Sequence, residues 1–307
     1  MKVLVIGGTG HVSGAVVRAA LAQGHDVWSV TRGERPRPDS PVTWLTADRQ
    51  ESGAMERAVA TAGETWDLVV DCICYDVPEM QQDVALFRDR ARHLAFVSTD
   101  FVYDPARRTF PQPEDTEHYV TGSEGSQDYG RRKRLCELEL AAADTGGMAW
   151  TVLRPCHIYG PTSELGCLPL HGRDRDLITR LRAGEAIRLV GGGHFLQQPI
   201  LADDLARTIL SVAGCEAAHG QVFNTAGPDV VESWQYYQYI AEVLGVELTV
   251  EEVSVQHYRA QNPGHAPFLC HRVYDISRLS NCGLRAPDTS LAGGLRLHVE
   301  GLLARRD

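Results

Sequence analysis

Short apolar runs alternate with amphipathic stretches along the first half of the chain. Runs rich in Val, Ile and Leu predict β-strands at residues 2–6, 25–30, 42–45, 66–74, 93–98 and 149–153. Between most of them, apolar residues recur at helical spacing, which predicts helices at residues 15–23, 53–62, 79–90 and 127–144. The run at 66–74 is apolar almost throughout, as in strands that are buried on both faces. Alternating strands and helices predict an α/β fold with a doubly wound parallel sheet.

The second half of the chain is less regular. Pro, Gly and charged residues are denser between residues 155 and 193. Further on, the pattern predicts a strand and helix within 199–213, strands at 221–225 and 247–253, helices at 233–244 and 290–303, and a loop at 256–267. We therefore expect two domains. Residues 1–155 with about 197–226 would form the sheet domain, and about 156–196 with 227–307 a smaller C-terminal α/β substrate-binding domain.

A glycine-rich string, Gly7-Gly8-Thr9-Gly10-His11-Val12-Ser13-Gly14, follows the first strand and leads into the first helix. Glycines at this place allow a tight turn and let backbone N–H groups approach a pyrophosphate at the helix N-terminus. Ser13 stands where a third glycine is expected and is a small substitute for it. The string therefore predicts a dinucleotide-binding Rossmann domain. The cofactor contacts expected in this turn are Gly7, Thr9, Gly10, His11 and Val12.

The choice between NAD and NADP is read at the end of the second strand. A carboxylate at that point binds the ribose 2′-hydroxyl and selects NAD. This chain instead has Thr31-Arg32-Gly33, with Arg35 close by. Arg32 could bind the 2′-phosphate of NADP, or it could be a surface residue that stacks on adenine, and NADP is favoured. Asp48 could meet the adenine amino group, or cap the following helix.

Tyr129 and Lys133 are four residues apart on a predicted helix, so their side chains share one face. A nearby cation lowers the pKa of a tyrosine and makes it a better proton-transfer group. The chain has only two lysines, Lys2 and Lys133, although Arg is frequent. A helix that needed only surface charge would be expected to carry Arg, as at positions 131, 132 and 134. The alternative is a solvated basic face with a chance Tyr.

Composition and charge exclude several classes of function. The net charge of −10 argues against a general nucleic-acid binder. No apolar run reaches about 18 residues, so no membrane span is expected. The eight cysteines show neither Cys-x-x-Cys pairs nor Cys/His zinc spacing, so we expect no metal site. Buried free thiols are typical of a reducing compartment, and the cytoplasm is the expected location.

These motifs together resemble the extended short-chain dehydrogenase/reductase superfamily, and within it the NAD-dependent epimerase/dehydratase family. The resemblance covers most of the chain. It rests on the strings Gly7-Gly8-Thr9-Gly10, Val97-Ser98-Thr99-Asp100-Phe101-Val102-Tyr103, Tyr129-x-x-x-Lys133, Leu153 to Pro161 and Asp203-Asp204-Leu205-Ala206. Some stretches, notably 3–14 and 67–75, also look like the subgroup related to chloroplast RNA-associated proteins.

The resemblance implies roles for individual residues. Tyr129 would be the acid/base, Lys133 would hold the nicotinamide ribose and lower the pKa of Tyr129, and Thr99 would hydrogen-bond the reacting oxygen. Cys72 would line the cofactor, in a segment where the family usually has His-x-Ala-Ala. Asp100 would be a spare acid near the reacting oxygen or a turn-stabilising carboxylate.

Departures from the family pattern bear on the substrate and the reaction. Relatives that act on nucleotide sugars usually have Asn at the His157 position and Arg near the Gln197 position. A neutral Gln is a poor partner for a diphosphate, which favours a neutral polyhydroxylated or nucleoside-like substrate. His157 could bind the substrate, act as a second acid/base, or be a buried structural residue. Phe101 stands where the related dehydratases have a catalytic Glu, which argues against dehydration.

We therefore expect an NAD(P)-dependent epimerase or oxidoreductase that acts on a secondary alcohol or ketone of a sugar-like or nucleoside-like substrate. Epimerisation through a transient ketone is preferred over net reduction by an NAD(P)H-dependent ketoreductase. The alternative from another class is a cofactor-binding scaffold or RNA-associated protein with vestigial catalysis. A homodimer is common among relatives and is expected by resemblance.

Overall fold

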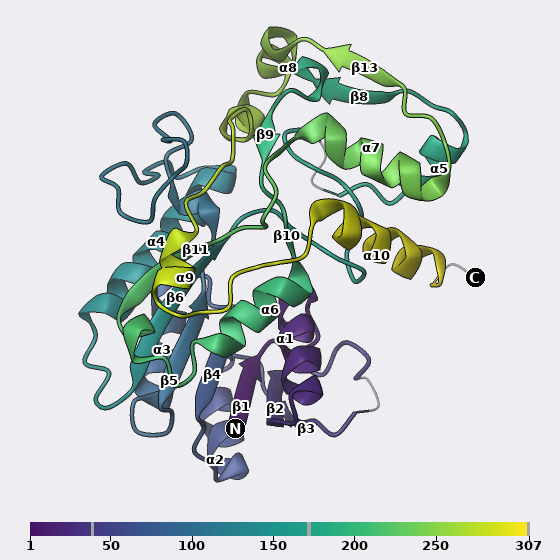
Figure 1. The fold of residues 1–307 in the computed structure, drawn as a ribbon. Helices are drawn as coiled ribbons and strands as arrows, with labels where there is room; N and C mark the ends of the chain where they lie inside the picture. Colours follow the sequence, from purple (N-terminus) through teal and green to yellow (C-terminus); the bar gives the residue numbers. More distant parts are fainter. Residues whose placement is uncertain (38–39, 171–172, 306–307) are drawn as a thin grey trace.

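The largest unit is a seven-stranded sheet (Figure 1). The computed structural model describes residues 1–37, 40–170 and 173–305. The strand order is β11-β6-β5-β4-β1-β2-β3, and each neighbouring pair is parallel. In chain order the strands are β1 (Lys2–Ile6), β2 (Asp26–Thr31), β3 (Thr43–Thr46), β4 (Leu68–Asp71), β5 (His93–Val97), β6 (Ala149–Pro155) and β11 (Gln221–Thr225).

Helices cover both faces of this sheet, because successive strand residues point to opposite sides. Helices α1 (His11–Ala22) and α6 (Ala202–Ser211) pack on one face, where Val3, Val5 and Val70 belong to their cluster. On the other face, Leu4, Ile6 and Val69 pack with three further helices. These are α2 (Ala54–Ala62), α3 (Val77–Phe87) and α4 (Gly125–Ala142). The predicted doubly wound parallel sheet is confirmed.

A third hydrophobic cluster lies in the upper part of Figure 1, around helices α5, α7 and α10. Its short strands pair two by two, as β7 with β10, β9 with β12 and β8 with β13. The domain boundaries stay a prediction. The elements here are β7 (Ile158–Tyr159), α5 (Leu177–Arg182), β8 (Ile187–Val190), β9 (Leu196–Gln197), β10 (Ile200–Leu201), β12 (Val231–Glu232), α7 (Ser233–Leu244), β13 (Val250–Val253), α8 (Val255–Gln261) and α10 (Leu291–Leu303). Helix α9 (Ser277–Asn281) lies instead beside β11 of the sheet, where its Leu279 belongs to the cluster of α1 and α6.

Two local expectations are corrected. Residues 256–267, expected to be a loop, are largely helical: α8 is followed by a 3-10 helix over Pro263–Phe268. Ser254 caps α8 by accepting a hydrogen bond from the His257 amide, and the buried Tyr258 bonds His265 at 2.7 Å. Helix α1 begins directly after the glycine turn, four residues earlier than the apolar periodicity indicates.

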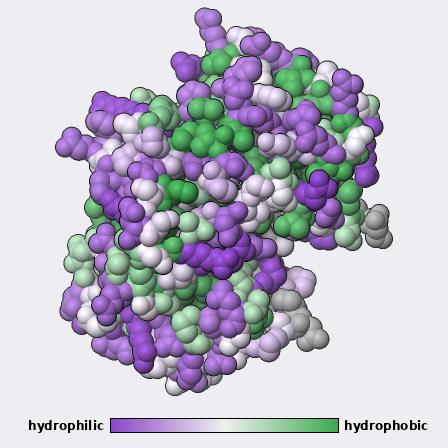
Figure 2. Space-filling model, in the orientation of Figure 1, coloured by the Kyte–Doolittle hydropathy of each residue, from purple (hydrophilic) through white to green (hydrophobic). Residues whose placement is uncertain are grey.

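Hydrophilic residues are spread over most of the face of the molecule seen in Figure 2, with smaller hydrophobic groups between them. Across residues 1–37, 40–170 and 173–305, no helix is long and apolar enough to span a bilayer.

Candidate active site

Two cavities lie where the central strands of the sheet end. The first, about 290 Å³, is lined by residues that follow β4, β5 and β6 and by Tyr129 and Lys133 of α4. The second, about 410 Å³, is lined by the glycine turn and by residues that follow β2 and β3. Tyr75 borders both cavities, so they are adjacent. Ligands of open α/β sheets bind at this carboxyl edge.

The glycine turn leaves no room for side chains. Gly7 has a φ of +93°, and a Cβ atom there would lie 2.8 Å from Ile73. A Cβ on Gly8 would lie 2.0 Å from the Ser29 hydroxyl. The Ser13 hydroxyl donates to the Gly7 carbonyl and accepts from the Gly10 amide at 3.0 Å. Ser13 therefore holds the turn from inside rather than only replacing a glycine.

The cofactor residues predicted in the turn separate into two groups. Gly7, Thr9 and Gly10 line the second cavity, whereas Val12 lines the first. His11 lines neither of the two, and its Nδ1 atom bonds the Thr162 hydroxyl at 2.6 Å. Burial lowers the pKa of His11 to about 3, with a further contribution from Arg173, so its ring is neutral.

The residues at the far end of the second cavity include the carboxylate of Glu34, which was not among the residues predicted from the sequence. Arg32, Arg35 and Asp48 line this cavity as expected, but so does Glu34. Glu34 forms an exposed ion pair with Arg32 at 2.8 Å. The Asp48 carboxylate accepts a hydrogen bond from the Gln50 amide at 3.0 Å. Arg32 thus has an acidic partner beside it, and exposed pairs of this kind are weak.

Tyr129 lies beside the turn that follows β5. Its hydroxyl is hydrogen-bonded to Thr99, and Thr99 also accepts from the Phe101 amide at 3.2 Å. Gly130 allows this approach, because a Cβ there would lie 2.0 Å from the Phe101 carbonyl oxygen. The residue after the tyrosine is therefore a glycine for a structural reason. The sequence pattern gave no sign of this contact.

Lys133 is fully buried, so the alternative of a solvated basic face is wrong for this residue. Its Nζ atom donates to the Cys74 carbonyl at 2.8 Å and to the Val97 carbonyl at 2.6 Å. It also lies 4.3 Å from the centroid of the Phe96 ring. Burial lowers the pKa of Lys133 below its usual range.

The expected lowering of the Tyr129 pKa is not seen. Burial, followed by the nearby Tyr75, raises the pKa of Tyr129 to about 12, although the hydrogen bond to Thr99 acts in the opposite direction. The Lys133 ammonium group is held by carbonyl oxygens rather than by the phenol. In the free protein Tyr129 is therefore a protonated phenol.

Asp100 lines the first cavity, but its carboxylate is already engaged. It forms ion pairs with Arg272 and, at 3.4 Å, with Arg108, and it accepts a hydrogen bond from Tyr274. Burial opposes ionisation, yet Arg272 and Arg108 lower the pKa of Asp100. A carboxylate that stays ionised cannot donate a proton, so the expected role of spare acid is wrong. Arg108 is only eight residues away, but Arg272 and Tyr274 lie more than 170 positions further along the chain, and no short motif marks them.

The two remaining candidates for substrate binding have different outcomes. His157 lines the first cavity, where burial and then Arg173 lower its pKa to about 4. Gln197 is not among the residues that line the cavity of Tyr129. It is fully buried in β9, and both polar atoms of its side chain lack a hydrogen-bond partner. The expectation that Gln197 meets the substrate is therefore not supported by its position.

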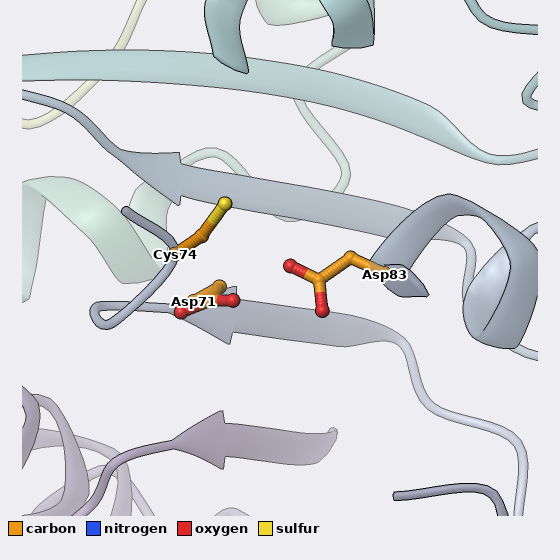
Figure 3. A group of neighbouring side chains, drawn as sticks. All are labelled: Asp71, Cys74 and Asp83. Atoms are coloured by element: carbon orange, nitrogen blue, oxygen red, sulfur yellow. The ribbon is translucent and has the colours of Figure 1, made fainter. Parts of the chain in front are cut away.

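A buried group beneath the second cavity has the donor types of a metal site. Figure 3 shows the side chains of Asp71, Cys74 and Asp83 close together, with ligand atoms within 4.8 Å of one another. Arg49 already supplies a cation, at 2.7 Å from Asp71 and 2.9 Å from Asp83. The two carboxyl groups also hydrogen-bond each other. We interpret the group as a structural network in which one carboxyl is protonated.

Asp83→Asn is expected to change stability by no more than about 1 kcal/mol, whereas Asp71→Asn should cost about 2 kcal/mol. Burial and the nearby Asp71 raise the pKa of Asp83 well above its usual range. For Asp71, burial also opposes ionisation, but the Arg49 cation outweighs it and lowers the pKa of Asp71. The stability that the neutral Asp83 carboxyl provides is complete below its unfolded pKa and is lost as pH rises through its folded pKa.

Denaturant unfolding between pH 4 and pH 9 measures this difference. The wild-type protein should lose stability with rising pH relative to the Asp83→Asn variant. Equal pH dependence in the two proteins would contradict the protonated carboxyl.

A doubly wound sheet, a glycine turn after its first strand and a Tyr/Lys pair at its carboxyl edge define a dinucleotide-binding enzyme of the short-chain dehydrogenase type. Residues 79–226 match the model of the NAD dependent epimerase/dehydratase family. This match covers just under half of the chain, which in this part is similar to members of that family.

Similar proteins include both reductases and epimerases. The 2′-dehydrokanamycin reductase of Streptomyces kanamyceticus is 26% identical over 309 residues, which cover 96% of this chain and 81% of the reductase. The chloroplast stem-loop binding protein of 41 kDa b from Arabidopsis thaliana is 24% identical over 271 residues, 84% of this chain and 66% of that protein. The structure of UDP-glucose 4-epimerase from Thermotoga maritima, solved with UDP-glucose, is 20% identical over all of both chains, with a TM-score of 0.77. That structural likeness shows the fold alone.

Proposed function

We propose that the protein is an NAD(P)-dependent epimerase or oxidoreductase that acts on a secondary alcohol or ketone of a sugar-like or nucleoside-like substrate. One observation carries this proposal: Thr99, Tyr129 and Lys133 come from two separate elements and line a single cavity. This cavity adjoins the one that holds the glycine turn. A proton-transfer group thus lies next to a site built for a dinucleotide.

The residues of the second cavity fit a dinucleotide, because the turn lets its backbone approach a ligand where a Cβ atom could not be accommodated. Gly7, Thr9, Gly10 and Val12 would hold the pyrophosphate at the start of α1. Arg32 and Asp48 would hold the adenosine end, and Cys72 and Lys133 the nicotinamide end. When bound, the nicotinamide accepts or supplies a hydride at C4.

Tyr129 would transfer the proton at the reacting oxygen, while Thr99 orients that oxygen by a hydrogen bond. The protonated phenol of the free protein is the form that donates a proton when a ketone becomes an alcohol. The second candidate is an NAD(P)H-dependent ketoreductase, for which the 26% identical reductase is a precedent. Epimerisation needs both directions of the same step at one carbon. The mass of the product distinguishes epimerisation from reduction. An epimer has the same mass as the substrate, whereas a reduced product has two more hydrogens.

Dehydration has no support in this site. It needs one acid and one base beside the threonine. Asp100 is held ionised by two arginines, and Phe101 cannot accept a proton. A product that has lost water would contradict this assignment.

Absorbance of the purified protein near 340 nm, with mass spectrometry of any released cofactor, tests the proposal. Bound or bindable NAD(P) is the expected result. Failure of the protein to bind either nucleotide would favour the scaffold or RNA-associated alternative. The 24% identical stem-loop binding protein motivates that alternative. The residues Thr99, Tyr129 and Lys133 and the net charge of −10 argue against it.

Arg32→Asp should shift preference from NADP to NAD. We propose NADP as the preferred cofactor because Arg32 and Arg35 both border the adenosine end of the cavity, although Glu34 pairs with Arg32. A carboxylate at position 32 repels a 2′-phosphate and can bind a 2′-hydroxyl. Dissociation constants for both nucleotides measure the change. Tighter binding of NAD than NADP by the wild-type protein would refute the preference.

We also propose a cytoplasmic homodimer. All eight cysteines are free, as expected in a reducing compartment. Leu135 and Leu138 of α4 have exposures of 38% and 48%, so this helix presents apolar side chains to a partner copy. Light scattering would give the mass, and a monomer at micromolar concentration would refute the dimer.

A further inference from the structure

Two buried arginines beside the first cavity share one carboxylate. The side chains of Arg108, Arg272 and Asp100 are each only 2% exposed. Asp100 is the ion-pair partner of both guanidinium groups, and in the described part of the chain no second carboxylate lies within ion-pair distance of either. The Nε atoms of both arginines are buried without a hydrogen-bond partner. These three residues, Arg108, Arg272 and Asp100, are called the trio below, and together they carry one uncompensated positive charge.

The groups around the trio do not supply the missing negative charge. Tyr274 donates its hydroxyl to Asp100, and burial raises its pKa well above its usual range, so it is neutral. Of the other residues that line the cavity, Arg173 and Lys133 are cations and His157 is neutral. The lining thus holds three cations against one carboxylate, in a chain whose net charge is −10.

Buried charges in folded proteins are usually compensated, because an unpaired ion loses its hydration and gains no partner in return. Arg272 both belongs to the trio and lines the cavity, so a ligand can reach it. We infer that the substrate carries an anionic group, a carboxylate or a phosphate, which binds against Arg272. This inference rests on the proposed function and names the class of substrate, an acidic sugar.

The position of the anion follows from the Phe101 ring, which lies close to both Tyr129 and Arg272. The Phe101 ring lies 6.2 Å from the Tyr129 ring and 4.6 Å from the Arg272 guanidinium carbon. Arg272 and Tyr129 line the same cavity, whose volume of about 290 Å³ is on the scale of a single substituted sugar ring. The anionic group is therefore attached to the reacting ring or next to it. The inference thus departs from the neutral substrate that was expected from Gln197.

The inference is tested by calorimetric binding of five probes at constant ionic strength: D-glucuronate, D-glucose 6-phosphate, D-glucose, D-glucosamine and uridine diphosphate. Glucuronate or glucose 6-phosphate should bind at least about tenfold more tightly than glucose, the usual scale of a charge-assisted hydrogen bond. Glucosamine should bind no better than glucose. The preferred anion tells a carboxylate from a phosphate.

Arg272→Gln should remove this preference and leave a folded protein, because Asp100 keeps Arg108 as its partner. Arg92→Gln is the matched control: its side chain is 86% exposed and pairs with Asp67 at the opposite edge of the sheet. It should keep the preference. Circular dichroism checks that both variants are folded.

Three results would overturn the inference: equal or tighter binding of the neutral or amino sugar, no detectable binding of either acidic sugar, or a preference that survives in Arg272→Gln. Uridine diphosphate could also bind more tightly than both acidic sugars, in a way that depends on Arg272. That result would overturn the placement of the anionic group on the reacting sugar ring. Titration of NAD(P) in the same samples separates the two proposals. Cofactor binding without an anion preference defeats only the acidic substrate, whereas absent cofactor binding defeats the proposed function itself.

Discussion

Tyr129→Phe is expected to lower turnover by at least about a hundredfold, the usual scale for a positioned acid/base. The phenyl ring keeps the contacts with Phe101 and Tyr75, so the fold should be unchanged. Only the hydroxyl is lost, and with it the proton and the hydrogen bond to Thr99. Steady-state rates of the wild-type and variant proteins measure the effect, once a substrate has been found among acidic sugars.

Tyr75→Phe is the matched control, since Tyr75 lines the same cavity and its ring lies 6.4 Å from that of Tyr129. It should keep most of the activity, and both variants should still bind NAD(P). Unchanged turnover in Tyr129→Phe, or an equal loss in both variants, would remove Tyr129 from its role.

Lys133→Arg should also fail to support turnover, with a loss of about a hundredfold, the cost of displacing a catalytic group by about 1 Å. The Lys133 ammonium group fits between two carbonyl oxygens and the Phe96 ring, and it has no solvent-exposed surface into which a larger guanidinium could move. A displaced charge would also stabilise the Tyr129 phenolate less in the complex. In the direction of alcohol oxidation, the pH optimum should therefore move alkaline.

Arg132→Lys serves as the control for this change. Arg132 lies on the same helix, its side chain is 41% exposed, and it pairs with Asp128. Rates and pH profiles for both variants, together with thermal unfolding, make the comparison. An unaltered pH–rate profile and normal turnover in Lys133→Arg would show that the lysine has no part in catalysis.

The fold and the core of the site could be predicted because their signals are local. Strand and helix periodicity gave the doubly wound sheet, and the glycine string gave the turn before α1. The four-residue spacing placed Tyr129 and Lys133 on one helix, and the structure brings both to one cavity.

What could not be predicted depends on contacts between distant segments. The partners of Asp100 include Arg272, 172 positions away, and no local pattern links them. Burial decides the pKa of Tyr129, and the depth of its site is a property of the folded chain. Gln197 was assigned to the substrate by resemblance, yet β9 places it in the core. The helix at 255–261 was missed because one buried residue, Tyr258, anchors it without an amphipathic pattern.

A crystal structure of the protein soaked with NAD(P)+ tests the central claim most directly. We predict a pyrophosphate against the backbone of Gly7 to Val12, and a nicotinamide ring in the cavity of Thr99 and Tyr129, with its ribose next to Lys133. A cofactor bound elsewhere, or a nicotinamide ring away from Tyr129 in a fully occupied site, would contradict hydride transfer in this cavity.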